Sequence, residues 1–167
     1  MAALLAIAAA GAFAVPGNAQ AHPVSGSAVA GVGQVTLDES DALGDRVWFA
    51  IVAATAADGS SNGRFWFRHL SPQGTLRGEG WADVTCLQVT GKVALFTAVV
   101  PEGVGMVKNH AFYMKITDRG AKPDQVSFVQ ALNGPERPPT DCFEFEVPYP
   151  TRPRYPVLIG GYTVHAG

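Results

Sequence analysis

The chain has 167 residues, with 12 basic and 14 acidic side chains and a net charge of −2 at pH 7. The two signs are interspersed, so the sequence offers no basic surface for nucleic acid or for an anionic membrane. The length fits a single domain with a sizeable core.

The first 21 residues predict a secretory signal peptide. An apolar run extends from Ala2 to Val15, Pro16-Gly17-Asn18 ends it, and the small-residue triplet Ala19-Gln20-Ala21 follows. Only the Met1 amino group supplies a positive charge before the run. The alternative to a signal peptide is an uncleaved transmembrane helix. Because about 20 apolar residues are needed to cross a bilayer, the run is too short for that. We expect a secreted protein with no membrane insertion after cleavage and with His22 at its mature N-terminus.

The predicted organisation is a signal peptide over 1–21, an N-terminal extension over 22–33 and one β domain over 34–167. The first strand runs from Arg46 to Ala54, where apolar residues occupy both alternating faces. Asp58 to Gly63 form a turn. Arg64 to Leu70 then alternate and complete a hairpin, with Phe65, Phe67 and His69 on one face and Trp66 on the other.

Further strands follow the same pattern. Val84–Val89 and Val93–Val100 predict a second hairpin around Thr90-Gly91, and Ala111–Thr117 and Gln125–Leu132 predict a third. Residues 135–156 contain 7 of the 12 prolines, which predicts an extended connection, with Phe143–Val147 as a candidate edge strand. Val157–His165 predict a final strand. Short strands at this spacing favour an antiparallel β-sandwich or open barrel.

The chain contains two cysteines, Cys86 and Cys142. An even count in an exported chain favours one disulfide between them. Two unpaired buried thiols are the alternative, and a metal site is disfavoured because no second ligand lies close in the sequence.

Several of these segments together resemble a family, the uncharacterised secreted bacterial β-domain proteins of the Val-Thr-Cys-Leu type. The resemblance rests on Gly63–Phe67, Val84–Gly91, Asp118–Phe128, Asp141-Cys142 and Gly161–His165. It implies a small exported β domain with no assigned activity and no catalytic residues.

Two kinds of segment that resemble functional motifs are predicted to be turns. Gly59-Ser60-Ser61-Asn62-Gly63 matches the hydrolase pattern Gly-x-Ser-x-Gly, but a β run follows it where a nucleophile elbow requires a helix. The acidic stretches Asp38–Asp41 and Asp118–Gly120 lack the spaced ligands of a calcium loop, so their carboxylates are expected to bond nearby backbone.

The histidines suggest one metal hypothesis. A mature N-terminal His22 could bind copper through its amine and its ring, with His69, His110 or His165 completing the site. No spacing marks the second ligand, and His69 and His110 share a strand face with apolar residues, as a structural histidine does.

A second candidate site is aromatic. Trp48, Trp66, Trp81 and Tyr113 alternate with the residues assigned to the core, so they form a candidate ligand surface for a glycan or a protein partner, or they pack in a second inner layer. We therefore predict a secreted, non-catalytic binding or structural module without a cofactor. The alternative is an exported copper-binding protein or enzyme that uses His22.

Overall fold

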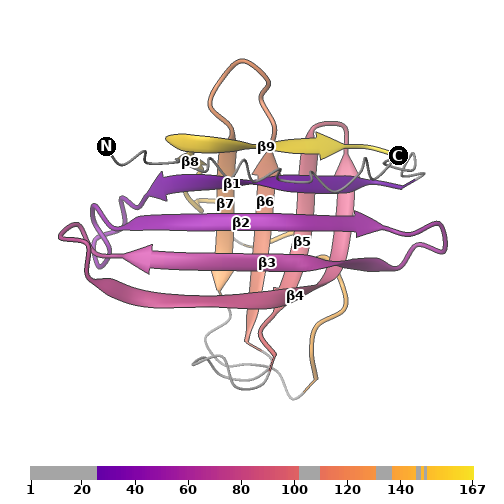
Figure 1. Cartoon of the computed structure of the whole chain (residues 1–167), viewed down its shortest axis with the longest axis horizontal. Coiled ribbons are helices and arrows are strands. Elements are labelled where there is room, and N and C mark those ends of the chain that lie inside the picture. The colour runs from indigo at the N-terminus through magenta and orange to yellow at the C-terminus, as the bar shows by residue number, and fades with distance from the viewer. Residues whose placement is uncertain (1–25, 102–109, 131–136, 146–147, 149) are drawn as a thin grey trace, which may run out of the picture.

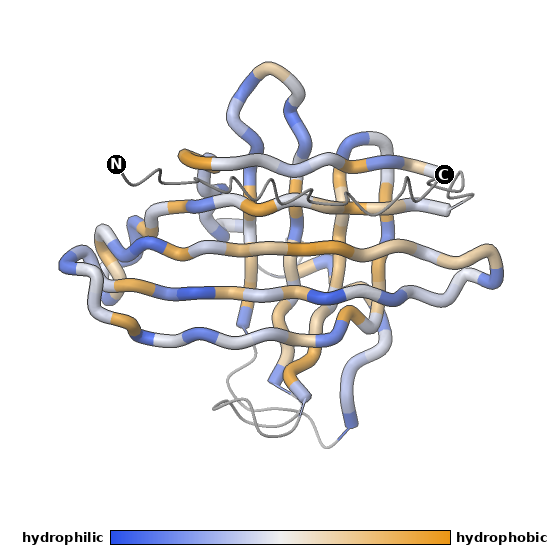
Figure 2. The backbone as a smooth tube through the Cα atoms, viewed as in Figure 1, coloured by the Kyte–Doolittle hydropathy of each residue, from blue (hydrophilic) through white to orange (hydrophobic). Residues whose placement is uncertain are grey.

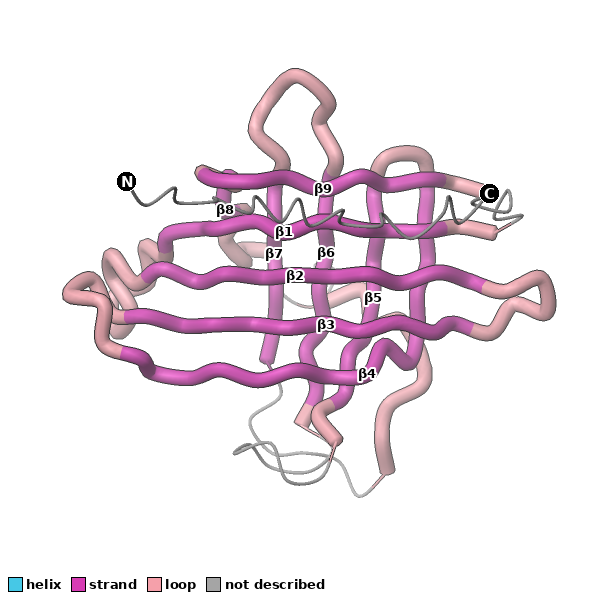
Figure 3. Tube along the Cα trace, in the orientation of Figure 1, coloured by secondary structure: helices cyan, strands magenta, loops and turns pink. Residues whose placement is uncertain are grey.

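A computed structural model of the chain describes residues 26–101, 110–130, 137–145, 148 and 150–167. These residues form nine strands and no helix (Figure 3). The strands are β1 (Ala28–Thr36), β2 (Arg46–Thr55), β3 (Ser61–Leu70), β4 (Leu76–Thr90), β5 (Val93–Val99), β6 (Ala111–Thr117), β7 (Gln125–Gln130), β8 (Tyr155–Pro156) and β9 (Ile159–His165). Within these described ranges, no helix could span a membrane. The predicted signal peptide lies outside them.

All nine strands belong to one antiparallel sheet with the order β8-β7-β6-β5-β4-β3-β2-β1-β9. The sheet curls into a half-barrel of two layers whose strands cross at a steep angle (Figure 1). The front layer contains β9, β1, β2, β3 and the first part of β4, and the back layer contains the rest of β4 with β5, β6 and β7. This confirms the predicted all-β antiparallel fold.

The two edges of the sheet meet through a short segment between β8 and β9. Tyr155 pairs with Val126 on β7, and the next residues cross to the front layer. The Val157 amide donates to the Asp124 carbonyl at 2.8 Å, and the Leu158 amide donates to the Gln34 carbonyl on β1 at 2.8 Å. The chain therefore bridges the back and front layers within a few residues.

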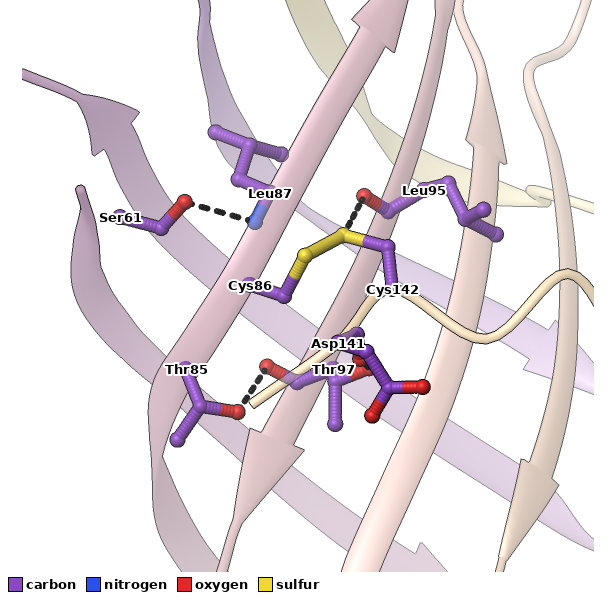
Figure 4. The surroundings of a disulfide bond; sticks show 8 residues. All are labelled: Ser61, Thr85, Cys86, Leu87, Leu95, Thr97, Asp141 and Cys142. Atoms are coloured by element: carbon purple, nitrogen blue, oxygen red, sulfur yellow. Dashed lines mark hydrogen bonds between the residues drawn. A yellow bond between two sulfur atoms is a disulfide. The ribbon is translucent and has the colours of Figure 1, made fainter. Parts of the chain in front are cut away.

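β4 belongs to both layers, and a β-bulge and a disulfide mark the place where it bends. Its pairing with β5 shifts register between Val84 and Cys86, which leaves Thr85 as the extra residue of the bulge. The predicted disulfide joins Cys86 to Cys142, with the Cα atoms 5.3 Å apart (Figure 4). Next to it, the Thr97 hydroxyl on β5 donates to the Asp141 carbonyl at 2.7 Å. The disulfide therefore ties the proline-rich connection to the outside of the bend.

The core lies between the two layers. Side chains alternate along the strands, and Figure 2 shows the matching alternation of apolar and polar residues along β3. The largest fully buried side chains include Phe49, Phe65, Phe96, Met114 and Ile116. Phe65 lies at the centre, with ring centroids 5.7 Å from both Phe49 and Phe96.

The structure differs from the predicted elements in three places. β1 begins at Ala28, inside the segment expected to be an extension, and β4 begins at Leu76, well before the predicted Val84. Both stretches are rich in glycine, which favours loops when only local propensity is considered. Packing requires a glycine at position 33 of β1, because a Cβ there would lie 2.8 Å from the ring of Tyr162. Residues 143–145 of the candidate edge strand are not in a strand.

Candidate functional site

The three tryptophans gather on the outer face of the front layer, as their alternation predicts. Trp66 on β3 lies directly opposite Trp81 on β4, and Trp48 on β2 lies opposite Arg68 on β3. All three rings are partly buried. Directly opposed side chains on antiparallel strands are neighbours on one face of the sheet, so Trp66 and Trp81 lie side by side on the outer face.

A cation lies over the ring of Trp81. The guanidinium carbon of Arg64 lies 3.9 Å from the centroid of the Trp81 ring, and its Nε lies 3.0 Å from Oδ1 of Asp83. A second ion pair, Arg68 with Glu79 at 3.8 Å, follows along the same two strands. The side chains of both pairs are 39–65% exposed, so they contribute little to stability but give the tryptophans a polar border without net charge.

Next to the tryptophans, the outer face is apolar and hollowed. A shallow hollow of about 440 Å³ is lined by Val32, Ala50, Val52, Trp66, Trp81 and neighbouring backbone, with Arg64 as its only charged side chain. A second hollow of about 440 Å³ continues past Val52 to Ala30, Ala54 and Asn62. Val52 is 68% exposed and Val32 is 43% exposed. We define the outer patch as Ala30, Val32, Ala50, Val52, Trp66 and Trp81.

Tyr113, the fourth aromatic residue of the predicted ligand surface, lies elsewhere. It belongs to β6 in the back layer, and its ring contacts Phe143 with the centroids 5.1 Å apart. Burial, together with the Asp141 carboxylate, raises the pKa of the Tyr113 hydroxyl. The structure therefore brings together the three tryptophans and separates Tyr113 from them.

His69 belongs to a polar cluster around the buried Asp45, which sequence reasoning missed. Its Nε2 lies 2.7 Å from Oδ2 of Asp45, a carboxylate that is only 1% exposed, and Nε of Arg77 lies 2.9 Å from the same oxygen. Oδ1 of Asp45 has no hydrogen-bond partner among the described residues. Because Asp45 precedes His69 by 24 residues and lies in a loop, no local pattern links the two.

The other described histidines lie apart from His69. His110 is 5% exposed just before β6, with its ring stacked on Phe112, and burial lowers the pKa of its imidazole. His165 is exposed at the end of β9. The part of the chain that the structure describes contains no group of three potential metal ligands from His, Cys, Asp and Glu. His22, on which the copper hypothesis depends, lies outside that part.

The Gly-x-Ser-x-Gly segment lies in the β2–β3 hairpin. Asp58 accepts hydrogen bonds from the Ser60 amide at 2.9 Å and from the Ser60 hydroxyl, which closes the turn. Ser61 already lies in β3, and its hydroxyl accepts a hydrogen bond from the Leu87 amide at 2.9 Å (Figure 4). Ser61 therefore helps to attach β3 to the bulged part of β4.

Comparisons of the chain with protein-family models, with curated proteins and with solved structures found no match.

Proposed function

We propose that the chain is an exported, non-catalytic binding module that uses the outer patch to bind another protein. The observation that carries this proposal is the exposure of the patch. An antiparallel sheet that buries one face normally presents polar side chains on the other. Here Val32 and Val52 are exposed beside two tryptophans, on a face opposite the core. Contiguous apolar surface with a polar rim is typical of interaction sites.

The composition of the patch favours a protein partner over a glycan. Sugars require hydrogen-bonding side chains around an aromatic ring, whereas the hollow beside Trp66 and Trp81 is lined almost entirely by apolar groups. Its one charged group, Arg64, is already engaged by Asp83. Tryptophan and arginine are among the residues that protein interfaces favour.

Export is part of the same proposal. The Cys86–Cys142 disulfide supports an oxidising compartment, and the apolar run with its Ala19-Gln20-Ala21 triplet supports a cleaved signal. We also propose that the chain belongs with the secreted bacterial β-domain proteins that its motifs resemble. The tight β4–β5 turn, in which Gly91 follows Thr90 with a φ of 58°, is consistent with that.

The proposal can be tested with envelope material from the cell that produces the protein. We expect the labelled disulfide-bonded protein to bind this material saturably, and Val52→Asp to abolish the binding by placing a charge in the outer patch. The matched control is Leu43→Asp, which adds the same charge at a residue that is 69% exposed and lies outside the patch.

Treatment of the envelope material separates the two kinds of partner. Protease should remove the binding sites, and periodate, which oxidises sugars, should leave them intact. Loss with periodate alone would identify a glycan ligand and overturn the protein-partner proposal. Equal loss in both variants, or no saturable binding, would overturn the assignment of the outer patch.

A further inference from the structure

A cavity of about 220 Å³ opens between the two layers, on the opposite side of the sheet from the outer patch. Its lining comes from the loop between β1 and β2, from β2 and β3 of the front layer, and from β6 and β7 of the back layer. Mouths of β-barrels are a preferred place for small-molecule sites. The volume is below the 300–1,000 Å³ of drug-sized pockets, so this cavity suits a small ligand.

Four phenylalanine rings form the inner wall of the cavity. Phe49 and Phe128 meet edge to face across the layers with centroids 5.1 Å apart, and Phe67 and Phe112 meet at a tilt with centroids 4.9 Å apart. Phe49, Phe67 and Phe112 are almost fully buried. Four aromatic rings around a small volume favour a flat apolar group in the ligand.

The outer part of the cavity is lined by polar side chains, two of which are carboxylates. Glu39 and Asp41 come from the β1–β2 loop, Gln130 comes from the end of β7, and His69 comes from the end of β3. Oδ2 of Asp45 lies 2.7 Å from Nε2 of His69 and 2.9 Å from Nε of Arg77.

Carboxylates outnumber guanidinium groups among the described residues at the cavity. Glu39 and Asp41 line it, no described Lys or Arg does, and the buried Asp45 lies beside it at His69. The cations that contact these carboxylates are Arg77, 2.9 Å from Asp45, and Arg152, 3.7 Å from Glu39.

We propose that this cavity binds a small organic ammonium ion. The apolar part of the ligand lies among the phenylalanine rings, and its ammonium group lies near Glu39 and Asp41, where water still reaches it. This position avoids the full desolvation cost of a buried charge while retaining the attraction of the carboxylates. An anion of the same size meets repulsion from those carboxylates.

The test uses 2-phenylethylammonium and phenylacetate, which share a phenyl ring and differ in the sign of the charge. Calorimetry on the disulfide-bonded protein near pH 7 gives the dissociation constants, and amide chemical shifts locate the site. We expect the ammonium ion to bind at least about tenfold more tightly, through attraction by two carboxylates and repulsion of the anion. The shifts should concentrate at Phe128 and Gln130.

Two matched variants separate a local effect from net charge. Glu39→Gln removes a carboxylate of the cavity, and Glu79→Gln removes one on the outer face beside Arg68. We expect Glu39→Gln to weaken ammonium binding about threefold, the size of one exposed ion pair, and Glu79→Gln to leave it unchanged. Phe128→Leu keeps an apolar side chain and should weaken the ammonium complex by removing a ring.

The proposal is overturned if phenylacetate binds as tightly as the ammonium ion, or if neither titration is saturable. It is also overturned if Glu79→Gln weakens binding as much as Glu39→Gln, or if the shifts concentrate on the outer patch. Apart from shifts on the outer patch itself, these results leave binding by the outer patch untouched, because Val52 and Trp66 do not line the cavity.

Discussion

Asp124 holds β9 to the back layer through the backbone of Tyr162. Its Oδ2 accepts a hydrogen bond from the Tyr162 amide at 2.7 Å, and its Oδ1 accepts one from the Arg119 amide at 2.8 Å. The side chain belongs to the turn between β6 and β7, whereas Tyr162 belongs to a strand that pairs with β1 of the front layer. One buried carboxylate thus closes a turn and connects the two layers.

Replacement of Asp124 by alanine should destabilise the fold by about 2–3 kcal/mol, because the buried Tyr162 amide loses a charged acceptor. Urea denaturation measures the free energy of unfolding. Asp58→Ala is the matched control, since Asp58 closes a turn in the same way but is exposed and bonds Ser60 within that turn. Equal losses in the two variants would refute a connecting role for Asp124.

Removal of the disulfide should cost about 4 kcal/mol in the chain-entropy model for a sequence separation of 56 residues. The Cys86→Ser, Cys142→Ser double variant avoids a free thiol, and its denaturation midpoint should match that of the reduced wild type. Intact mass before and after reduction checks the bond in the native protein. A wild type whose mass and midpoint do not change on reduction would contradict the pairing.

Phe65 and Trp66 are neighbours on β3 that face opposite sides, so alanine at the two positions should have unequal effects. Phe65 is 1% exposed and contacts four other phenylalanine rings. Phe65→Ala should cost about 3–5 kcal/mol through the cavity that it leaves in the core. Trp66→Ala on the outer face should cost about 1 kcal/mol. Denaturation curves compare them, and a larger loss at Trp66 would contradict the assignment of the faces.

His110 should make stability depend on pH. Burial lowers the pKa of its imidazole below the ordinary value of 6.5, so the unfolded chain takes up a proton at higher pH than the folded one. The free energy of unfolding should therefore be greatest above pH 6.5 and should fall as the pH drops through and below that value.

Urea titrations at about pH 7.5 and about pH 5 measure this fall. His110→Gln removes the titrating group, so its stability should fall less between the two conditions. His165→Gln, at an exposed position, should behave like the wild type. An identical fall in all three proteins would exclude His110 as the cause.

Local sequence patterns predicted the strands whose two faces differ. Arg64–Leu70 and Ala111–Thr117 carry large apolar residues at alternate positions, and both are strands in the structure. β1 was missed because its glycines serve a distant contact, the approach of Tyr162 from the other end of the chain. The first half of β4 was missed for a similar reason, since Gly78 and Gly80 form a strand only by pairing with β3.

The candidate sites also divide into features that local sequence patterns predict and features that only the folded sheet creates. Alternation placed Trp48, Trp66 and Trp81 on one outer face, because side-chain direction along a strand is a local property. It could not show that Tyr113 belongs to the other layer, nor that His69 bonds Asp45, because both depend on how the sheet curls. The four rings of the cavity come from four strands, and only the closed fold brings them together.

The pairing of β1 with β9 has a consequence for the order of folding. Every strand from β2 to β7 pairs with its neighbours along the chain, whereas β1 also pairs with the last strand. During synthesis, hairpins can form as each strand emerges, but the outer edge of β1 stays unpaired until the C-terminal residues arrive. Exposed edges of this kind are where chains associate wrongly. A nascent chain that stalls before Ile159 should therefore be the form most prone to aggregation and most in need of a chaperone.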